Sequence, residues 1–179
     1  MKFAPTELPG VARVSLEPFA DARGFFARLH CPDEFAAAGL PFVPAQTSLS
    51  RNDAVFTLRG LHFQAPPNDE AKLVRVTRGA IYDVVVDLRR DSPTFRRWIA
   101  ATLSADNGEA LLIPAGCAHG FLTLEAATDV LYQIDRLHVP GQARGLRYDD
   151  PAIGVAWPAP PRVIAPADLA WPGLAELPI

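Results

Sequence analysis

The chain has 179 residues, of which 49% are hydrophobic and 21% charged, and its formal net charge is −3 at pH 7. These values are typical of a globular protein and exclude both a disordered chain and a broad basic surface for nucleic acid. No segment approaches the roughly 20 apolar residues that span a bilayer, and Pro5 interrupts any N-terminal signal sequence. One cytoplasmic domain over residues 1–179 is therefore predicted, without membrane or nucleic-acid partners.

The predicted elements are mostly short strands, because 18 prolines and 12 glycines divide the chain into short segments. Strands are expected at 13–16, 56–58, 72–76, 80–88, 98–103, 110–113, 120–124 and 130–135. One short helix is expected from Pro32 to about residue 38, with Gly39 at its C-terminal end. From about Pro151 the chain becomes proline-rich, which indicates a wrapping tail. The pattern predicts an all-β barrel or sandwich with minor helix.

The strands at 72–76 and 80–88 form the clearest predicted pair. The tight connection between them ends at Gly79, which is free to adopt positive φ. In the second strand, alternation places Asp83 and Asp87 on one face together with two aliphatic residues. Two carboxylates on one face predict a polar or wet side, as in a small barrel with a functional interior.

Two segments contain histidines at informative spacings. The pattern G-x5-P-x-G-x2-H, which ends at His119, matches the second motif of the cupin superfamily, in which a turn delivers a histidine into a barrel. A metal-binding cupin would carry His-x-His in the other segment, but Gly60 stands where the first of those histidines would be, before His62. A metal site built from His62, His119 and a carboxylate would need an unusual geometry, so no metal is predicted.

The order of several motifs resembles the dTDP-4-dehydrorhamnose 3,5-epimerase family from about residue 14 to 171. The similar segments are D-x-RGF (21–25), RGLHFQ (59–64), KLVRV-x-RG (72–79), DVVVDLR (83–89), SPTF (92–95), IP-x-G-x-AHGF (113–121), LY (131–132) and RGLRYDDP (144–151). This resemblance implies a cupin or jelly-roll barrel, an isomerase without cofactors, a nucleotide-sugar substrate and a homodimer. The implied reaction inverts C3, C5 or both in a nucleotide-linked 4-keto-6-deoxy sugar.

The resemblance also assigns four catalytic positions. His62 corresponds to the general base and Asp168 to the carboxylate that orients it. Lys72 corresponds to the residue that stabilises the enolate oxygen, and Tyr132 to the general acid on the opposite face of the sugar. These residue types suit the chemistry, because neutral histidine is a base near pH 7 and a cationic donor stabilises a developing oxyanion.

Six substrate-binding positions are implied as well, namely Arg23, Phe26, Gln46, Arg59, His119 and His138. In the family the first two positions reach across a dimer interface into the partner's nucleotide site. The chain departs from the family on this nucleotide side. His138 replaces a usual tyrosine, Ser48 a usual asparagine, and Arg28 and Gly141 stand where glutamate is typical. The departures leave the identity of the sugar and of the nucleotide open.

Three other functions are compatible with parts of the sequence. A sugar-nucleotide 3,4-ketoisomerase would use similar enolisation, although the placement of Lys72 and Tyr132 favours epimerisation. A metal-dependent cupin enzyme is disfavoured by the absent His-x-His, and elemental analysis distinguishes it. A non-catalytic sugar-nucleotide-binding module would bind without solvent exchange at the sugar carbons.

Overall fold

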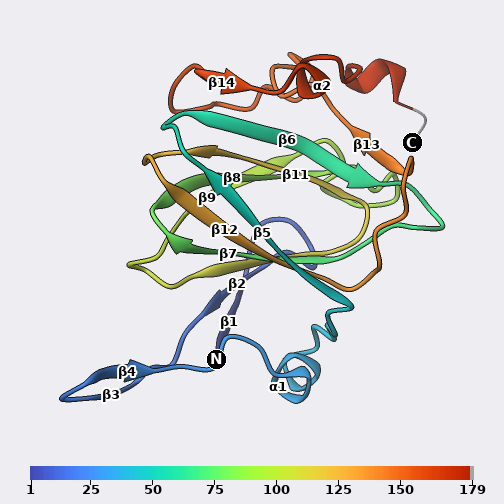
Figure 1. Ribbon diagram of the computed structural model, residues 1–179. Helices are drawn as coiled ribbons and strands as arrows, with labels where there is room; N and C mark the ends of the chain where they lie inside the picture. The colour runs from blue at the N-terminus through green and yellow to red at the C-terminus, as the bar shows by residue number, and fades with distance from the viewer. Residues whose placement is uncertain (178–179) are drawn as a thin grey trace.

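The computed structural model describes residues 1–177, which form two facing antiparallel sheets (Figure 1). The first sheet has the order β1 (Lys2–Pro5), β2 (Ala12–Ser15), β10 (Ala110–Ile113), β7 (Lys72–Arg78), β12 (Thr128–Ile134), β5 (Gln46–Asn52). The second has the order β13 (Ala143–Gly145), β6 (Thr57–Gln64), β11 (Cys117–Thr123), β8 (Ala80–Asp87), β9 (Trp98–Ser104), with β14 (Val163–Ile164) parallel to β6. The expected all-β, cupin-like barrel is confirmed.

Side chains from both sheets fill the space between them. On β7, Val74 and Val76 point inward, and on β8, Ile81 and Val85 do so, as the two-residue period requires. Each of these four residues is at least 98% buried, and burying one such side chain contributes about 1.5–3 kcal/mol. The interior is therefore a packed core over most of its length, and polar residues enter it only at particular positions.

The predicted pairing of the strands at 72–76 and 80–88 is wrong. β7 pairs with β10 and β12, whereas β8 pairs with β9 and β11 in the other sheet. Gly79 does adopt positive φ, at 75°, but its turn carries the chain from one sheet to the other. A Cβ at this position would lie 2.4 Å from Thr128 Oγ1, so glycine is also required by packing. Alternation gives each strand its inward face without specifying its partner.

Several boundaries differ from the expected ones. The strand expected at 56–58 is the start of β6, which begins after Phe56 and continues through His62 to Gln64. Phe56 has φ 58°, a turn conformation that precedes the strand. The helix α1 (Pro32–Ala37) is confirmed, with φ 73° at Gly39. The elements not predicted from residue pattern include β3 (Phe19–Asp21), β4 (Gly24–Phe26), α2 (Pro166–Leu169) and the 3-10 turn η1 (Leu174–Glu176).

The face of β8 that carries two carboxylates is interior but not wet. Asp83 and Asp87 are both 0% exposed. Asp87 accepts hydrogen bonds from Arg89, from Ser92 Oγ at 2.6 Å and from Thr94 Oγ1 at 2.7 Å. Burial by itself raises the pKa of Asp87, but these hydrogen bonds outweigh burial and hold that pKa well below its usual range. Asp87 thereby ties the β8–β9 connection to the end of the barrel.

Replacing Asp87 by asparagine is expected to lower the melting temperature by roughly 5–10 °C at pH 7, because lost charge-assisted hydrogen bonds cost about 2–3 kcal/mol. The folded-state pKa of Asp87 is depressed, so its contribution is present above the ordinary pKa of about 3.9 and fades below it. Thermal melts of both proteins at pH 7, 4 and 2.5 test this. A gap in melting temperature that does not narrow with acidity would contradict the proposed charge effect.

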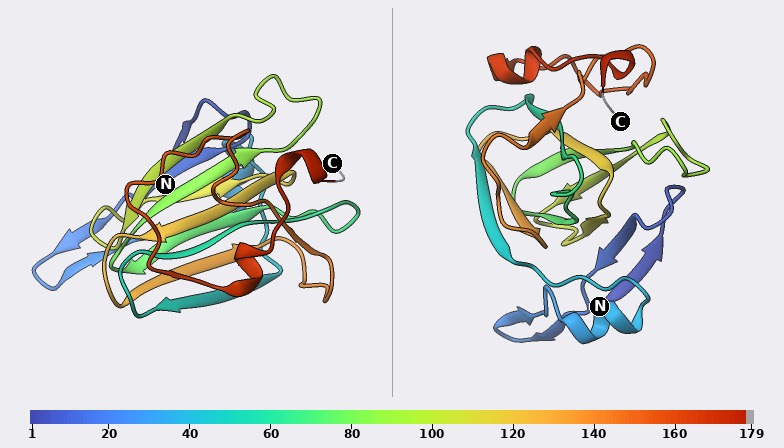
Figure 2. Two further views of the ribbon diagram at one scale, coloured as in Figure 1. Left: turned by 90° about the horizontal axis from the view of Figure 1, so that it is seen from above. Right: turned by 90° about the vertical axis from the view of Figure 1, so that its right-hand side faces the viewer.

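The segment 151–177 lies over the outer face of the second sheet (Figures 1 and 2). Its Ile153 and Leu174 pack in one cluster with Leu61 of β6 and with Val84 and Val86 of β8. The opposite side of the barrel is covered by α1 and neighbouring N-terminal residues (Figure 2, right). The segment 151–177 carries α2 across β6, which places Asp168 beside the barrel interior.

None of the helices within residues 1–177 is long or apolar enough to cross a bilayer.

Candidate active site

His62 of β6 and His119 of β11 are directly opposed across their antiparallel strands, so their side chains share the interior face. The His62 side chain is 39% exposed, which leaves it accessible from the mouth of the barrel. Its Nε2 lies 2.7 Å from Oδ1 of Asp168 on α2. Because Nε2 is occupied by the carboxylate, Nδ1 is the ring nitrogen that can take up a proton.

Three hydrogen bonds hold the Asp168 carboxylate. Besides His62, its carboxylate accepts hydrogen bonds from the Gly60 amide at 3.2 Å and from the Trp171 indole at 3.3 Å. Burial raises the pKa of Asp168, but the hydrogen bond and charge of His62, with smaller contributions from Gly60 and Trp171, lower it below its usual value overall. Asp168 is therefore ionised near neutral pH, and it can orient the imidazole and stabilise its protonated form.

Lys72 begins β7 on the facing sheet and is 92% buried. Its ammonium lies 3.1 Å from Oε1 of Glu70 and 3.5 Å from the backbone oxygen of His62. The strand alternation that turns Val74 inward also turns Lys72 inward. A cation is thus held at the mouth of the barrel, next to the strand that carries His62.

Tyr132 lies on β12, directly opposite Val74 of β7, and so shares the interior face with Lys72. Its ring packs edge-on against His119, with centroids 5.8 Å apart. His119 Nε2 in turn lies 2.7 Å from Oδ1 of the buried Asp83. Burial raises the pKa of the Tyr132 hydroxyl, and the Asp83 carboxylate raises it further. Tyr132 therefore remains a proton donor at neutral pH.

Three predicted substrate-binding residues lie around these groups. Besides His119, Arg59 of β6 donates from Nε to Asn52 Oδ1 at 2.7 Å and so links the two sheets. Gln46 of β5 opposes Ile134 of β12, in the same register that sets Ser48 opposite Tyr132. Gln46 and Ser48 are two residues apart and hence on the same face.

Within residues 1–177, the other predicted binding residues make no hydrogen bond or ion pair with the His62 side chain. Arg23 and Phe26 belong to the β3–β4 hairpin, which projects away from the barrel (Figure 1). The Arg23 side chain is 89% exposed and pairs with Asp21 on the same hairpin. His138 lies in the exposed connection between β12 and β13. Of the departures from the family pattern, Arg28 pairs with Glu34 at 2.6 Å, and Gly141 has φ 80°, a conformation that favours glycine.

The structure gives a physical reason for the missing His-x-His pattern. Gly60 lies against Gly120 of β11, and a Cβ at position 60 would lie 2.6 Å from the Gly120 Cα. A side chain there would require the two strands to separate. Within residues 1–177, no three histidine, cysteine or acidic side chains come close enough to hold a metal ion.

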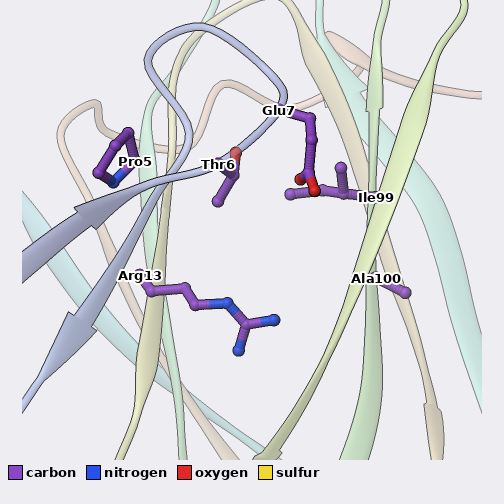
Figure 3. A pocket seen from close by; sticks show the side chains of 6 residues that line it. All are labelled: Pro5, Thr6, Glu7, Arg13, Ile99 and Ala100. Atoms are coloured by element: carbon purple, nitrogen blue, oxygen red, sulfur yellow. The ribbon is translucent and has the colours of Figure 1, made fainter.

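A separate cavity of about 370 Å³ lies between the first turn of the chain and β9 (Figure 3). Its six lining residues are Pro5, Thr6, Glu7, Arg13, Ile99 and Ala100. None of the residues around His62 contributes to it. The catalytic candidates therefore form their own cluster at the junction of β6, β11, β7 and β12.

Two residues near this cluster were not predicted as parts of the site. The sequence pattern predicts Asp83 only as one of two carboxylates on one strand face, because its contact with His119 depends on the pairing of β8 with β11. Glu70 is absent from the predicted site, and the structure places it in contact with Lys72. A glutamate two residues before a strand-opening lysine is a weak local signal, because both side chains are commonly exposed.

Comparison with known proteins finds a family model, curated relatives and solved structures that match this chain. A family model described as dTDP-4-dehydrorhamnose 3,5-epimerase matches residues 5–176. A protein of that name from Sinorhizobium fredii is 41% identical over 100% of this chain and 92% of its own length. A crystal structure of a dTDP-4-dehydrorhamnose 3,5-epimerase from Bacillus anthracis, with TDP and PPi bound, superposes with a TM-score of 0.94 at 37% identity, covering 97% of this chain and 99% of that one. A dTDP-4-dehydrorhamnose 3-epimerase from Streptomyces niveus is 34% identical over 94% of this chain and 81% of its own length.

Proposed function

We propose that this chain, which belongs to the dTDP-4-dehydrorhamnose 3,5-epimerase family, is an isomerase that inverts carbons next to the ketone of a dTDP-linked 4-keto-6-deoxy sugar. The observation that carries the proposal is the His62–Asp168 pair at the mouth of a barrel whose opposite wall presents Lys72 and Tyr132. A base on one wall and a proton donor on the other are what inversion of a carbon centre requires.

The first step is removal of a C–H proton beside the ketone. His62 Nδ1 takes this proton, and the electron pair of the C–H bond forms the enolate. Asp168, ionised and hydrogen-bonded to Nε2 at 2.7 Å, stabilises the resulting imidazolium. General-base catalysis of this kind contributes about 10²- to 10⁴-fold in rate.

The second requirement is stabilisation of negative charge on the ketone oxygen as the enolate forms. Lys72 supplies a buried ammonium on the facing sheet, where a low dielectric strengthens its attraction for an oxyanion. Removing one donor from comparable oxyanion sites costs about 3–4 kcal/mol in transition-state stabilisation.

Reprotonation completes the reaction. Tyr132 donates its hydroxyl proton to the enolate carbon from the face opposite to His62, which inverts the centre. The raised pKa of Tyr132 keeps this proton in place until the carbanion forms. One proton leaves the sugar and one returns, so the reaction has no net oxidation and no cofactor step.

The substrate class follows from the family and from the groups at the rim. The relative from Bacillus anthracis has TDP bound, and we propose that Arg59 and Gln46 of this chain contact the nucleotide part of such a substrate. Arginine matches the geometry of phosphate oxygens. Since the relative from Streptomyces niveus is named a 3-epimerase, inversion at C3 alone is the alternative outcome.

The test is to incubate the protein and a chelator with dTDP-4-keto-6-deoxy-glucose in heavy water and to follow the C3 and C5 protons by NMR. Loss of both signals, with inverted product, supports a 3,5-epimerase. Loss of the C3 signal alone identifies a 3-epimerase. If neither proton exchanges, the proposed activity on this substrate is wrong, and the departures at Ser48 and His138 become the reason to try other nucleotide sugars.

We also propose that the protein is a homodimer in which the β3–β4 hairpin of each copy completes the site of the other. The hairpin extends from the barrel and exposes Phe19, Phe25 and Phe26 by 75%, 67% and 74% (Figure 1). Three aromatic side chains exposed together are typical of an interaction surface. Arg23 on the same hairpin would bring a cation to the partner's nucleotide.

Replacing Phe26 by aspartate is therefore expected to shift the mass measured by light scattering from a dimer toward a monomer. Because Arg23 would leave the partner's site with the hairpin, KM for the nucleotide sugar should rise by about tenfold or more, as expected for a lost charge-assisted contact. Replacing the exposed Val163, which lies on β14 and outside the hairpin, by aspartate is the control for solubility effects. A parent protein that is monomeric at assay concentration would refute the shared site.

A further inference from the structure

We infer that Glu70 is a positioning residue for Lys72, an inference that rests on the proposed epimerase function. Glu70 lies in the connection between β6 and β7, two residues before Lys72. The Glu70 and Lys72 side chains are only 9% and 10% exposed, and Glu70 Oε1 lies 3.1 Å from the lysine Nζ. Such a pair is shielded from water and salt, unlike the exposed pairs that contribute little.

The contacts of Lys72 define where its ammonium points. An ammonium has three N–H donors, and here one faces Glu70 while a second is directed toward the His62 backbone oxygen at 3.5 Å. The third donor is left for the ketone oxygen of the substrate. A lysine side chain is otherwise flexible, with four methylene groups, so an anchor on its end fixes the donor direction. Glu70 supplies this anchor without contacting the substrate itself.

A second contact holds Glu70 in turn. Its other carboxylate oxygen accepts a hydrogen bond from the amide nitrogen of Gln64, the last residue of β6. An ionised carboxylate only accepts hydrogen bonds, so Gln64 must present its NH₂ group. The Gln64 side-chain oxygen is then buried and has no hydrogen-bond partner within the part of the chain that the structure describes. The chain Gln64–Glu70–Lys72 thus runs from the strand of the base to the cation of the oxyanion site.

This arrangement makes a specific prediction about glutamine at position 70. Its carbonyl could accept from Lys72 while its NH₂ donated to Gln64, whose amide would turn to offer its unpaired oxygen. The anchor on Lys72 would survive although the negative charge is lost. Alanine would remove the anchor, and aspartate would keep the charge but withdraw it by one methylene group. Hydrogen-bond geometry rather than charge should therefore decide the activity.

The experiment compares Glu70→Ala, Glu70→Gln, Glu70→Asp and Lys72→Ala with the parent, together with the Glu70→Ala/Lys72→Ala double variant. Steady-state kinetics with dTDP-4-keto-6-deoxy-glucose give kcat and KM. We expect Glu70→Ala to lower kcat by about 10- to 100-fold, with KM changed by less than about threefold, as for an interaction made in the transition state. The kcat of Glu70→Gln should stay within about threefold of the parental value, and Glu70→Asp should lower kcat about as much as Glu70→Ala does. In the Lys72→Ala background, Glu70→Ala should add less than about twofold, because coupled residues are not additive.

Asp69→Ala is the matched control, since it removes a carboxylate from the same connection and should leave kcat unchanged. Parental kcat in both Glu70→Ala and Glu70→Asp, or full additivity with Lys72→Ala, overturns the positioning role while leaving the epimerase function in place. A parent without activity overturns the function and the inference together. If Glu70→Ala does not fold, as thermal melts will show, the contrast between Glu70→Gln and Glu70→Asp decides the matter alone.

Discussion

Replacing His62 by alanine is expected to remove the exchange of both sugar protons with solvent and to lower kcat by about 10³-fold, within the range for a lost general base. The C–H bond next to the ketone is a weak acid, and His62 is the proposed base, with a ring that is hydrogen-bonded to Asp168. Lys72 and Tyr132 remain in the variant, but they act on charge that develops only as a base removes the proton.

The measurement is NMR in heavy water at matched protein concentrations, with the C3 and C5 signals integrated over time. His30 offers a control, because its Nε2 lies 3.0 Å from the Phe42 backbone oxygen in the cluster beneath α1, outside the candidate site. His30→Asn should therefore exchange both protons like the parent. If His62→Ala retained exchange at one carbon at the parental rate, His62 would serve as base for the other carbon only.

Binding measurements on His62→Ala distinguish a loss of catalysis from a loss of substrate affinity. The imidazole is about two-fifths exposed and meets the reacting carbon, so its removal should leave the affinity for the dTDP part nearly unchanged. Isothermal titration with dTDP measures that affinity directly. A large loss of dTDP affinity in His62→Ala would indicate a collapsed site rather than a missing base.

Local features of the fold could be predicted from the sequence, whereas the pairing of strands could not. Gly79 and Gly39 mark turns because positive φ is a property of single residues, and both adopt it. The partner of β7 is a different matter. Alternation gives its inward residues, but β8 presents the same pattern to any neighbour, and only the complete barrel shows that the two strands lie in different sheets.

The site shows the same limit. Residue pattern alone could mark His62 and His119 as interior histidines, and their cross-strand contact follows from pairing of β6 with β11. Asp168 is a single aspartate between alanine and leucine, 106 residues from His62, and only the family resemblance singled it out. Glu70 was missed because its role depends on burial, which a short polar connection does not reveal.

The jelly-roll topology explains why four distant residues can cooperate. Base and enolate-stabilising groups must face one another across the sugar, and two packed sheets provide two walls about 10 Å apart. One wall holds His62, whose partner Asp168 lies on α2 in the C-terminal segment. The other wall holds Lys72 and Tyr132 on neighbouring strands. Because each side chain stands on a regular strand, its direction is set by the pleat and by packing behind it.

Replacing Tyr132 by phenylalanine should produce a different failure from that of His62. The ring and its packing against His119 are preserved, while the hydroxyl proton is lost. His62 can still remove a sugar proton and return a deuteron from solvent to the same face. We therefore expect exchange in heavy water to continue with retention of configuration, while formation of inverted product falls by about 10²- to 10³-fold, as for a lost general acid.

NMR distinguishes the two processes, because deuterated starting material and epimerised product have different couplings. Tyr82 provides the matched control, since its ring packs against Trp157 on the outer face of the second sheet, with centroids 6.2 Å apart, and Tyr82→Phe should invert like the parent. Normal inversion in Tyr132→Phe would place the acid elsewhere. Equal loss of exchange and inversion would mean that Tyr132 also assists deprotonation. Exchange without inversion is the result that assigns base and acid to opposite walls of the barrel.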